Sequence, residues 1–289
     1  MKTSAALEVE TTDSLIAIDF LVDNVNLSKS RLKKLMNAGG VWLRRGSSPR
    51  YRLRRAMSDL KPGDVLEVYY DEALLEQPIR QSHLVKDNDI YSVWQKPAGV
   101  FCMGSDWGDH NCLDRQVELY FHKQRPAWPL TLVPAAARGL VMVSHHKRAS
   151  ARFLEHWESG EIQARWRLLL SGDQRARLQK ADGSASPLVA AACSDAGLSD
   201  LSVQNLEYQA GNRSTRLDVS GGIQSVESLL RWAAAMEVSL PCAGESVPAA
   251  ELLLPTEEGD ESRLELAPVE LLALQFECPF SGVQQAFAL

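Results

Sequence analysis

Residues 138–172, RGLVMVSHHKRASARFLEHWESGEIQARWRLLLSG, decide the fold of the longer part of the chain. The segment opens with Gly139 followed by a run of four apolar residues, which is typical of a buried strand. Its middle has apolar residues at helical spacing, and its end, up to Gly172, again has the composition of a strand. A strand–helix–strand unit of this kind predicts an α+β fold in which helices pack on a sheet.

The flanking sequence extends this prediction in both directions and gives a mixed or antiparallel sheet with packed helices over residues 84–289. The further expected elements are a strand at 90–94, a turn at Lys96–Gly99, a helix within 111–122, two antiparallel strands within 198–222, a helix at 223–238, and a helix or turn with a final strand pair in 265–289. Residues 1–14 are expected to be a loose tail, and residues 174–198 and 243–263 surface loops.

Charge is distributed unevenly along the chain. The 289 residues carry a net charge of −6, yet residues 27–61 contain 11 Lys and Arg and a single acid, so that this block carries +10 and the remainder −16. A basic block in an acidic chain is an electrostatic footprint for phosphate. The alternative is a solvated basic face without a partner. The predicted RNA contacts are Lys29, Arg31, Lys33, Lys34, Arg44, Arg45, Arg50, Arg52, Arg54 and Arg55.

The local pattern of the block predicts a small folded module at residues 13–72. A short amphipathic helix begins after Ser28, a plausible N-cap, and ends at Gly39-Gly40. It is followed by a strand, a turn at residues 46–49, a second strand, and a closing strand at residues 65–70. A helix and a small sheet with one basic face would make a compact phosphate-binding module.

The segments LSKSRLKKLMNAGG (27–40) and KPGDVLEV (61–68) resemble the ribosomal S-four-type RNA-binding module. The resemblance covers residues 13–70. It implies binding of structured RNA through the backbone and the shape of the RNA, a mode in which phosphate attraction does not depend on base identity.

Residues 84–289 resemble the catalytic domain of RluA/RsuA-type RNA pseudouridine synthases, which often carry such a module. Four segments match in order: DNDIYSVWQKPAGV (87–100), residues 138–172, LDVSGGIQSVESLL (217–230) and LLALQFECPFSG (271–282). The resemblance implies an RNA partner, rRNA or tRNA, and conversion of uridine to pseudouridine without a cofactor.

The same resemblance implies a degenerate active site. Aligned on Gly139, the family's nucleophilic aspartate position holds Pro134, which has no nucleophile and no titratable group. The family's tyrosine falls at Trp166, expected to keep an aromatic surface for stacking, and its arginine falls near Glu227, which reverses the charge. Lys96 of the Lys-Pro-Ala-Gly turn remains. We therefore expect an RNA-binding protein with little or no isomerase activity.

Two alternatives stay open, so the sequence does not decide whether the protein is an enzyme. A relocated carboxylate could restore catalysis, and Asp106, Asp109, Asp114 and Asp200 are the candidates. The chain could also be a protein–protein scaffold that has lost RNA, a function with which its acidic remainder is compatible.

No metal, cofactor or membrane partner is expected. The five cysteines are widely spaced without a Cys-x-x-Cys pair and are expected to be reduced and buried. The adjacent His145 and His146 point to opposite faces of a strand end, expected to be solvated, and do not make a ligand pair. No apolar run is long enough to span a membrane, and a cytoplasmic location is expected.

Overall fold

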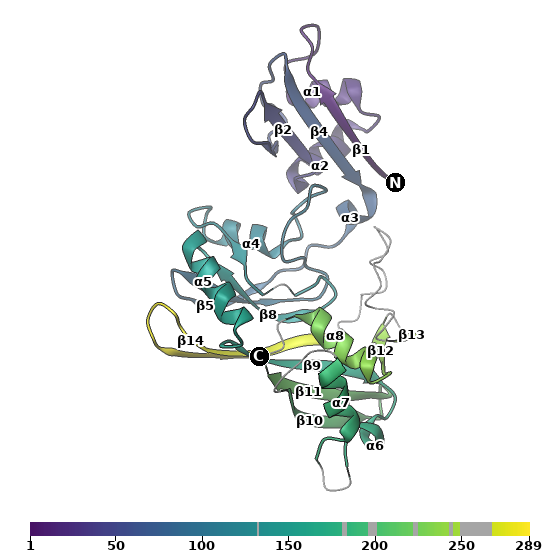
Figure 1. Ribbon diagram of the computed structural model, residues 1–289. Coiled ribbons are helices and arrows are strands. Elements are labelled where there is room, and N and C mark those ends of the chain that lie inside the picture. The colour runs from purple at the N-terminus through teal and green to yellow at the C-terminus, as the bar shows by residue number, and fades with distance from the viewer. Residues whose placement is uncertain (132, 181–183, 196–200, 222–224, 243–244, 249–267) are drawn as a thin grey trace. The chain divides into compact units, whose positions relative to one another are not determined.

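The computed structural model describes residues 1–131, 133–180, 184–195, 201–221, 225–242, 245–248 and 268–289, which form two compact units (Figure 1). Unit 1 comprises Met1–Ile79 and Met103–Tyr120, and unit 2 comprises Arg80–Cys102 and Phe121–Leu289. The units differ from the predicted domains at 13–72 and 84–289, because the first residues of the chain and a segment of the longer predicted domain both belong to unit 1.

Unit 1 contains a four-stranded sheet in the order β1-β4-β2-β3, on which the first three helices of the chain pack. Its elements are β1 (Lys2–Glu8), α1 (Ala17–Asn24), α2 (Lys29–Ala38), β2 (Val41–Arg45), β3 (Tyr51–Arg52), β4 (Asp64–Asp71), α3 (Glu72–Glu76) and α4 (Leu113–Tyr120). The expectation of a loose N-terminal tail is wrong, since β1 pairs with β4 from Lys2 opposite Asp71 to Glu8 opposite Val65. β1 is an exposed edge strand, so it has little of the hydrophobic alternation that marks a strand in sequence.

The predicted basic helix is confirmed as α2. The Ser28 hydroxyl accepts a hydrogen bond from the Arg31 N–H, and Gly39 ends the helix in the left-handed conformation at φ 87°. Leu32 and Leu35 on its apolar side are buried in the core of unit 1. The two caps therefore determine where α2 begins and ends, and its apolar stripe determines which side faces the core, as the sequence pattern predicts.

Unit 2 is built on a nine-stranded sheet whose main path is β10-β11-β9-β14-β8-β6-β5, with β15 on β14 and β7 on β8. Among the described strands of this sheet, β14 and β8 pair in parallel and the other pairs are antiparallel. The strands are β5 (His83–Asp87), β6 (Tyr91–Lys96), β7 (Trp128–Pro129), β8 (Arg138–Ser144), β9 (Gln163–Ser171), β10 (Ser202–Gln209), β11 (Ser214–Gly221), β14 (Val269–Glu277) and β15 (Gln284–Ala288). The predicted α+β fold with a mixed sheet is confirmed.

Helices α5 (Lys147–Glu158), α6 (Arg175–Leu178), α7 (Pro187–Asp195) and α8 (Val226–Ala235) belong to unit 2, as does the two-stranded ribbon of β12 (Ser239–Cys242) and β13 (Glu245–Pro248). The expected surface loop at 174–198 is wrong, because α6 and α7 occupy it and bury Leu178 and Val189. The predicted loop at 243–263 begins with β13 and otherwise lies outside the described residues.

No helix in the described ranges combines the length and the hydropathy that crossing a membrane requires. Of the four cysteines with described side chains, Cys102, Cys112 and Cys278 are buried and Cys193 is half-buried, and none of the four belongs to a disulfide.

The strand β8 lies against β14 so closely that Gly139 has no room for a side chain. A Cβ atom there would lie 2.3 Å from the carbonyl oxygen of Leu271, and the backbone has φ +127°, which side-chain-bearing residues rarely adopt. Gly139 is therefore a requirement of the parallel β8–β14 pair.

Gly139→Ala is expected to lower the free energy of unfolding by at least about 3 kcal/mol, because strain and a backbone clash add. Gly160→Ala is the control, since Gly160 also has a positive φ of 76° but a Cβ atom there would meet no other atom within 4 Å, and it should cost about 1 kcal/mol. Denaturant unfolding of both variants measures the difference. Equal costs would contradict the close-approach explanation.

The expectation that His145 lies at a solvated strand end is wrong. His145 is buried; its Nδ1 donates to the Pro126 carbonyl at 2.9 Å and its Nε2 lies 2.9 Å from the Ser92 hydroxyl. Ser92 in turn accepts from the Trp94 indole N–H at 2.7 Å. Burial lowers the pKa of His145 below its ordinary 6.5, so the neutral ring is the one that fits this network.

Because the unfolded chain binds this proton more readily than the folded one, stability should fall as pH drops below about 6.5, by at most about 1.4 kcal/mol per pH unit for one histidine. His145→Gln should reduce that pH-dependent loss, whereas His146→Gln at the exposed neighbour, whose repulsion is a minor cause of the lowered His145 pKa, should change it much less. Unfolding measured from pH 7 to pH 5 decides between them. An undiminished loss in His145→Gln would show that other groups carry the pH dependence.

Candidate functional site

A ladder of alternating charges crosses four neighbouring strands of the unit 2 sheet. Asp218 on β11 lies opposite Arg167 on β9, Arg167 lies opposite Glu270 on β14, and Glu270 lies opposite Arg138 on β8. Arg167 donates to both carboxylate oxygens of Asp218 at 2.7 and 2.9 Å. The second carboxylate, that of Glu270, receives a hydrogen bond of 3.1 Å from Arg138 and lies 3.9 Å from Arg167.

The ladder is buried at its carboxylates and open at one end. The side chains of Asp218 and Glu270 are 11% and 13% exposed, whereas that of Arg138 is 52% exposed. The hydrogen bonds that Arg167 donates to Asp218 raise the pKa of Arg167 further above its ordinary value. Both carboxylates therefore have their charge offset by arginines, and Arg138 brings a guanidinium group to the surface.

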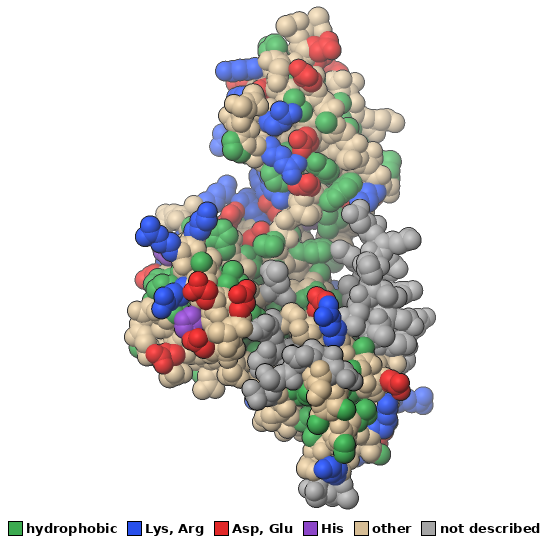
Figure 2. All heavy atoms as spheres, viewed as in Figure 1, with side chains coloured by type: hydrophobic (Ala, Val, Ile, Leu, Met, Phe, Trp, Pro, Cys, Tyr) green, Lys and Arg blue, Asp and Glu red, His purple; other side chains and the backbone are tan. Residues whose placement is uncertain are grey.

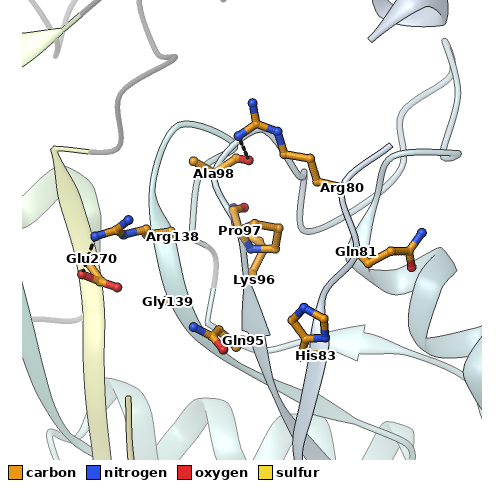
Figure 3. Close-up of a pocket in the computed structure, with 10 residues that line it drawn as sticks. All are labelled: Arg80, Gln81, His83, Gln95, Lys96, Pro97, Ala98, Arg138, Gly139 and Glu270. Carbon is orange, nitrogen blue, oxygen red and sulfur yellow. Dashed lines mark hydrogen bonds and ion pairs between the residues drawn. The ribbon is translucent and has the colours of Figure 1, made fainter. Parts of the chain in front are cut away.

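Arg138 and Glu270 lie at the edge of a pocket of about 580 Å³ (Figure 3). Its other lining residues are Arg80, Gln81, His83, Gln95, Lys96, Pro97, Ala98 and Gly139. A smaller pocket of about 150 Å³ shares Arg138 and Glu270 and adds Arg167 and Arg216. Among the described residues that line the two pockets, Glu270 is the single acid, and hydrogen-bond donors predominate. Such a lining suits an anionic or carbonyl-rich ligand.

Lys96 is fully buried beneath this pocket and ties two loops together. Its Nζ donates to the carbonyls of Val100 and Ala137 at 2.7 Å each, of Pro134 at 3.0 Å and of Pro97 at 3.3 Å. Burial lowers its pKa to about 8. The carbonyl oxygens offset the ammonium charge, and the loop before β8 is thereby fixed to the turn after β6.

The structure does not bring the four predicted pocket positions together. Lys96 contacts the backbone of Pro134, whose ring is exposed. Trp166 is 1% exposed and belongs to the core, so the expected stacking surface is absent there. Glu227 is exposed in the first turn of α8 and receives a 2.6 Å hydrogen bond from Arg231, so it lines neither pocket. A one-dimensional alignment cannot show which way a side chain points, so it could not show that Trp166 is buried and that Glu227 is exposed on α8.

The candidates for a relocated carboxylate lie elsewhere. Asp106 and Asp109 bind arginines of unit 1, and Asp114 accepts a hydrogen bond from the Gly104 N–H at 3.0 Å in the same unit. Burial raises the pKa of Asp114. Asp200 lies outside the described residues. In the described chain no group of three or more His, Cys, Asp or Glu residues could hold a metal ion.

The basic block of unit 1 is largely neutralised by acids from outside the block. The ion pairs join Lys29 to Asp19, Arg31 to Glu72, Lys34 to Glu76, Arg45 to Asp64, Arg50 to Glu67 and Asp106, and Arg52 and Arg54 to Asp109. Unit 1 as a whole contains 13 Lys and Arg against 15 Asp and Glu, a net charge of −2. Figure 2 shows basic and acidic side chains interspersed over it.

Few cations of the block are left without an ion pair. Of the ten predicted RNA contacts, Lys33, Arg44 and Arg55 have none within the described chain, and all three are exposed. Mutual repulsion among the cations of the block is therefore relieved largely within unit 1.

Solved structures that are similar to this chain include "Human RNA Pseudouridylate Synthase Domain Containing 1", at 12% identity and a TM-score of 0.47, covering 74% of this chain and 85% of that one. "Human RNA Pseudouridylate Synthase Domain Containing 4" is similar at 10% identity and a TM-score of 0.48, with 72% and 87% covered. A "pseudouridylate synthase" is similar at 13% identity and a TM-score of 0.36, with 96% of each chain covered. No protein-family model and no curated protein matches the sequence.

Lys96→Met is expected to lower the free energy of unfolding by about 3 kcal/mol or more, because buried carbonyls would lose a charged donor. The control is Lys61→Met, at an exposed lysine without an ion pair in the described chain, which should have little effect. Denaturant unfolding of the two variants provides the measurement. Matched stabilities would mean that the lysine does not hold the loop before β8.

Proposed function

We propose that this chain binds RNA, rRNA or tRNA, on a pseudouridine synthase-like scaffold and has little or no isomerase activity. The observation that carries the proposal is the pairing of Glu270 with two arginines, Arg138 and Arg167. Glu270 is the single acid among the described residues that line the two pockets. Pro134, at the position that the resemblance assigns to a nucleophile, presents a ring without a reactive group.

Isomerisation of uridine needs a group that attacks or moves a proton at the nucleotide, and such help typically contributes about 10²–10⁴-fold. A carboxylate in that role must reach the extruded nucleotide. Glu270 is 13% exposed on a central strand, and both of its cross-strand neighbours are arginines. Its position therefore suits Glu270 to orient the guanidinium groups of Arg138 and Arg167 at the pocket, and not to attack a ligand.

The proposed RNA contacts of unit 1 are those three of the ten predicted cations that no acid of the described chain neutralises, Lys33, Arg44 and Arg55. In unit 2 the proposed contact is Arg138, at the exposed end of the charge ladder. Guanidinium groups bind phosphate with two parallel hydrogen bonds and stay charged at all physiological pH values. The S-four-type character of unit 1 is part of the same proposal.

A second candidate function is isomerisation with Glu270 as the acting carboxylate. It is favoured by the place of Glu270 in the same pocket as Gly139, beside the loop that carries the family's nucleophile in the resemblance. Glu270→Gln separates the two candidates. Pseudouridine formation by the wild-type chain that this change abolishes would establish the second candidate in place of the first.

Arg44→Ala/Arg55→Ala is expected to lower affinity for an RNA hairpin by roughly an order of magnitude and to reduce the slope of log affinity against log salt by about 1.4–1.8, since two phosphate contacts are lost. The matched control is Arg148→Ala/Arg152→Ala, which removes two exposed arginines of α5 that also lack ion pairs in the described chain. Fluorescence anisotropy at several salt concentrations gives both quantities. Equal losses in the two double variants would contradict a footprint in unit 1.

A further inference from the structure

A loop of unit 1, residues 104–110, lies on the arginines of β3 and its neighbours. Arg50 Nη2 donates to Asp106 Oδ1 at 2.7 Å, and Arg52 Nη2 donates to the Ser105 carbonyl at 2.8 Å. The Trp42 indole N–H donates to the Asp106 carbonyl at 3.0 Å. The loop therefore supplies oxygen acceptors to side chains that the sequence pattern assigns to RNA.

One half of the loop is a fixed anchor. The Asp109 N–H donates to the Ala38 carbonyl at 2.9 Å, and its carboxylate binds Arg54 and lies 3.2 Å from Arg52 Nε. The Asp109 side chain is 10% exposed. A Cβ atom at Gly39 would lie 2.8 Å from an Asp109 carboxylate oxygen, so the glycine that ends α2 also makes room for the loop. Loss of Asp109 would leave two partly buried arginines without their carboxylate, and loss of both arginines would leave the Asp109 charge uncompensated.

In the other half of the loop, the carboxylate of Asp106 can be replaced on Arg50 by another anion. The side chains of Asp106 and Arg50 are 42% and 34% exposed, and ion pairs in that setting contribute little to stability because water and salt screen them. The Asp106 backbone would stay in place through the Trp42 hydrogen bond if its carboxylate turned away.

Arg50 itself is held ready by other groups. Its Nη1 binds Glu67 and lies 3.3 Å from the Tyr69 hydroxyl, and its guanidinium carbon lies 4.5 Å from the ring centre of Trp42. The Nη2 edge that binds Asp106 is thus oriented independently of Asp106. A guanidinium group fixed in this way loses little further freedom when it binds an anion.

We propose that Arg50, stacked on Trp42, is a phosphate-binding site for RNA that the Asp106 carboxylate occupies in the free protein. The proposal rests on the proposed RNA-binding function. A phosphodiester carries the same single charge as Asp106 and accepts the same hydrogen atoms at Nη2, while Glu67 keeps Nη1. RNA that binds there also releases counterions, which the intrachain pair does not. Asp106 therefore competes with RNA phosphate, whereas Asp109 holds the loop in either state.

The test is the RNA affinity of Asp106→Asn in the full chain, with Asp23→Asn as the matched control. Both changes remove one negative charge from unit 1, but Asp23 is exposed on α1 and has no ion pair in the described chain. The probe is an RNA hairpin of mixed sequence. Asp106→Asn should raise affinity about fivefold over the control at 0.1 M salt, because RNA phosphate no longer has to displace a carboxylate from Arg50, and the salt slope should match that of the control, because the number of phosphates contacted is the same.

A double-mutant cycle tests whether the gain in RNA affinity on Asp106→Asn depends on Arg50. Asp106→Asn should give no gain when Arg50 is already Gln, and thermal unfolding of each variant checks that the fold is kept. A gain equal to that of Asp23→Asn, a loss of affinity, or a gain that persists without Arg50 would each overturn the competition. If RNA binds the wild type through Arg44 and Arg55 but Asp106→Asn adds nothing, the phosphate site alone fails. If no protein in the series binds RNA, the proposed function fails and the site falls with it.

Discussion

A buried carboxylate needs a cation beside it, and in each unit of this chain two arginines meet that requirement. In unit 2 Glu270 lies between Arg138 and Arg167, brought into line by the register of three adjacent strands. In unit 1 Asp109 lies between Arg52 and Arg54 and holds a loop against the end of α2. In unit 1, arginines that look available for RNA in the sequence, Arg52 and Arg54, are therefore paired within the fold.

This constraint determines which groups remain for a ligand. An arginine that neutralises a buried acid cannot leave it without cost, so the proposed RNA contacts move to exposed cations and to half-exposed pairs such as Arg50 with Asp106. The same reasoning applies to catalysis. A carboxylate that orders two guanidinium groups at a pocket shapes that pocket for anions. Lys96 fixes the adjoining loop through backbone carbonyls and has no acid partner among the residues that the structure describes.

Local pattern was sufficient for much of the fold. The capped helix α2 and the unit β8–α5–β9 were predictable because caps, periodicity and apolar runs act over a few residues. The exposed edge strand β1 was missed for lack of such a pattern. The charge ladder could not be found, because Asp218, Arg167 and Glu270 are far apart in sequence and only the strand register aligns them. The neutralisation of the +10 block could not be predicted either, since Asp106 and Asp109, which pair with its arginines, lie outside it in the sequence.

We propose that, among the residues that the structure describes, the pocket beside Gly139 offers no carboxylate able to act on a nucleotide. The most direct measurement is transcriptome-wide mapping of pseudouridine in rRNA and tRNA from cells with and without this protein. We expect the pseudouridine maps of the two kinds of cell to be identical, and we expect RNA to be crosslinked to the protein in the cells that contain it. A pseudouridine that disappears on deletion, and returns with the wild-type chain but not with Glu270→Gln, would contradict it.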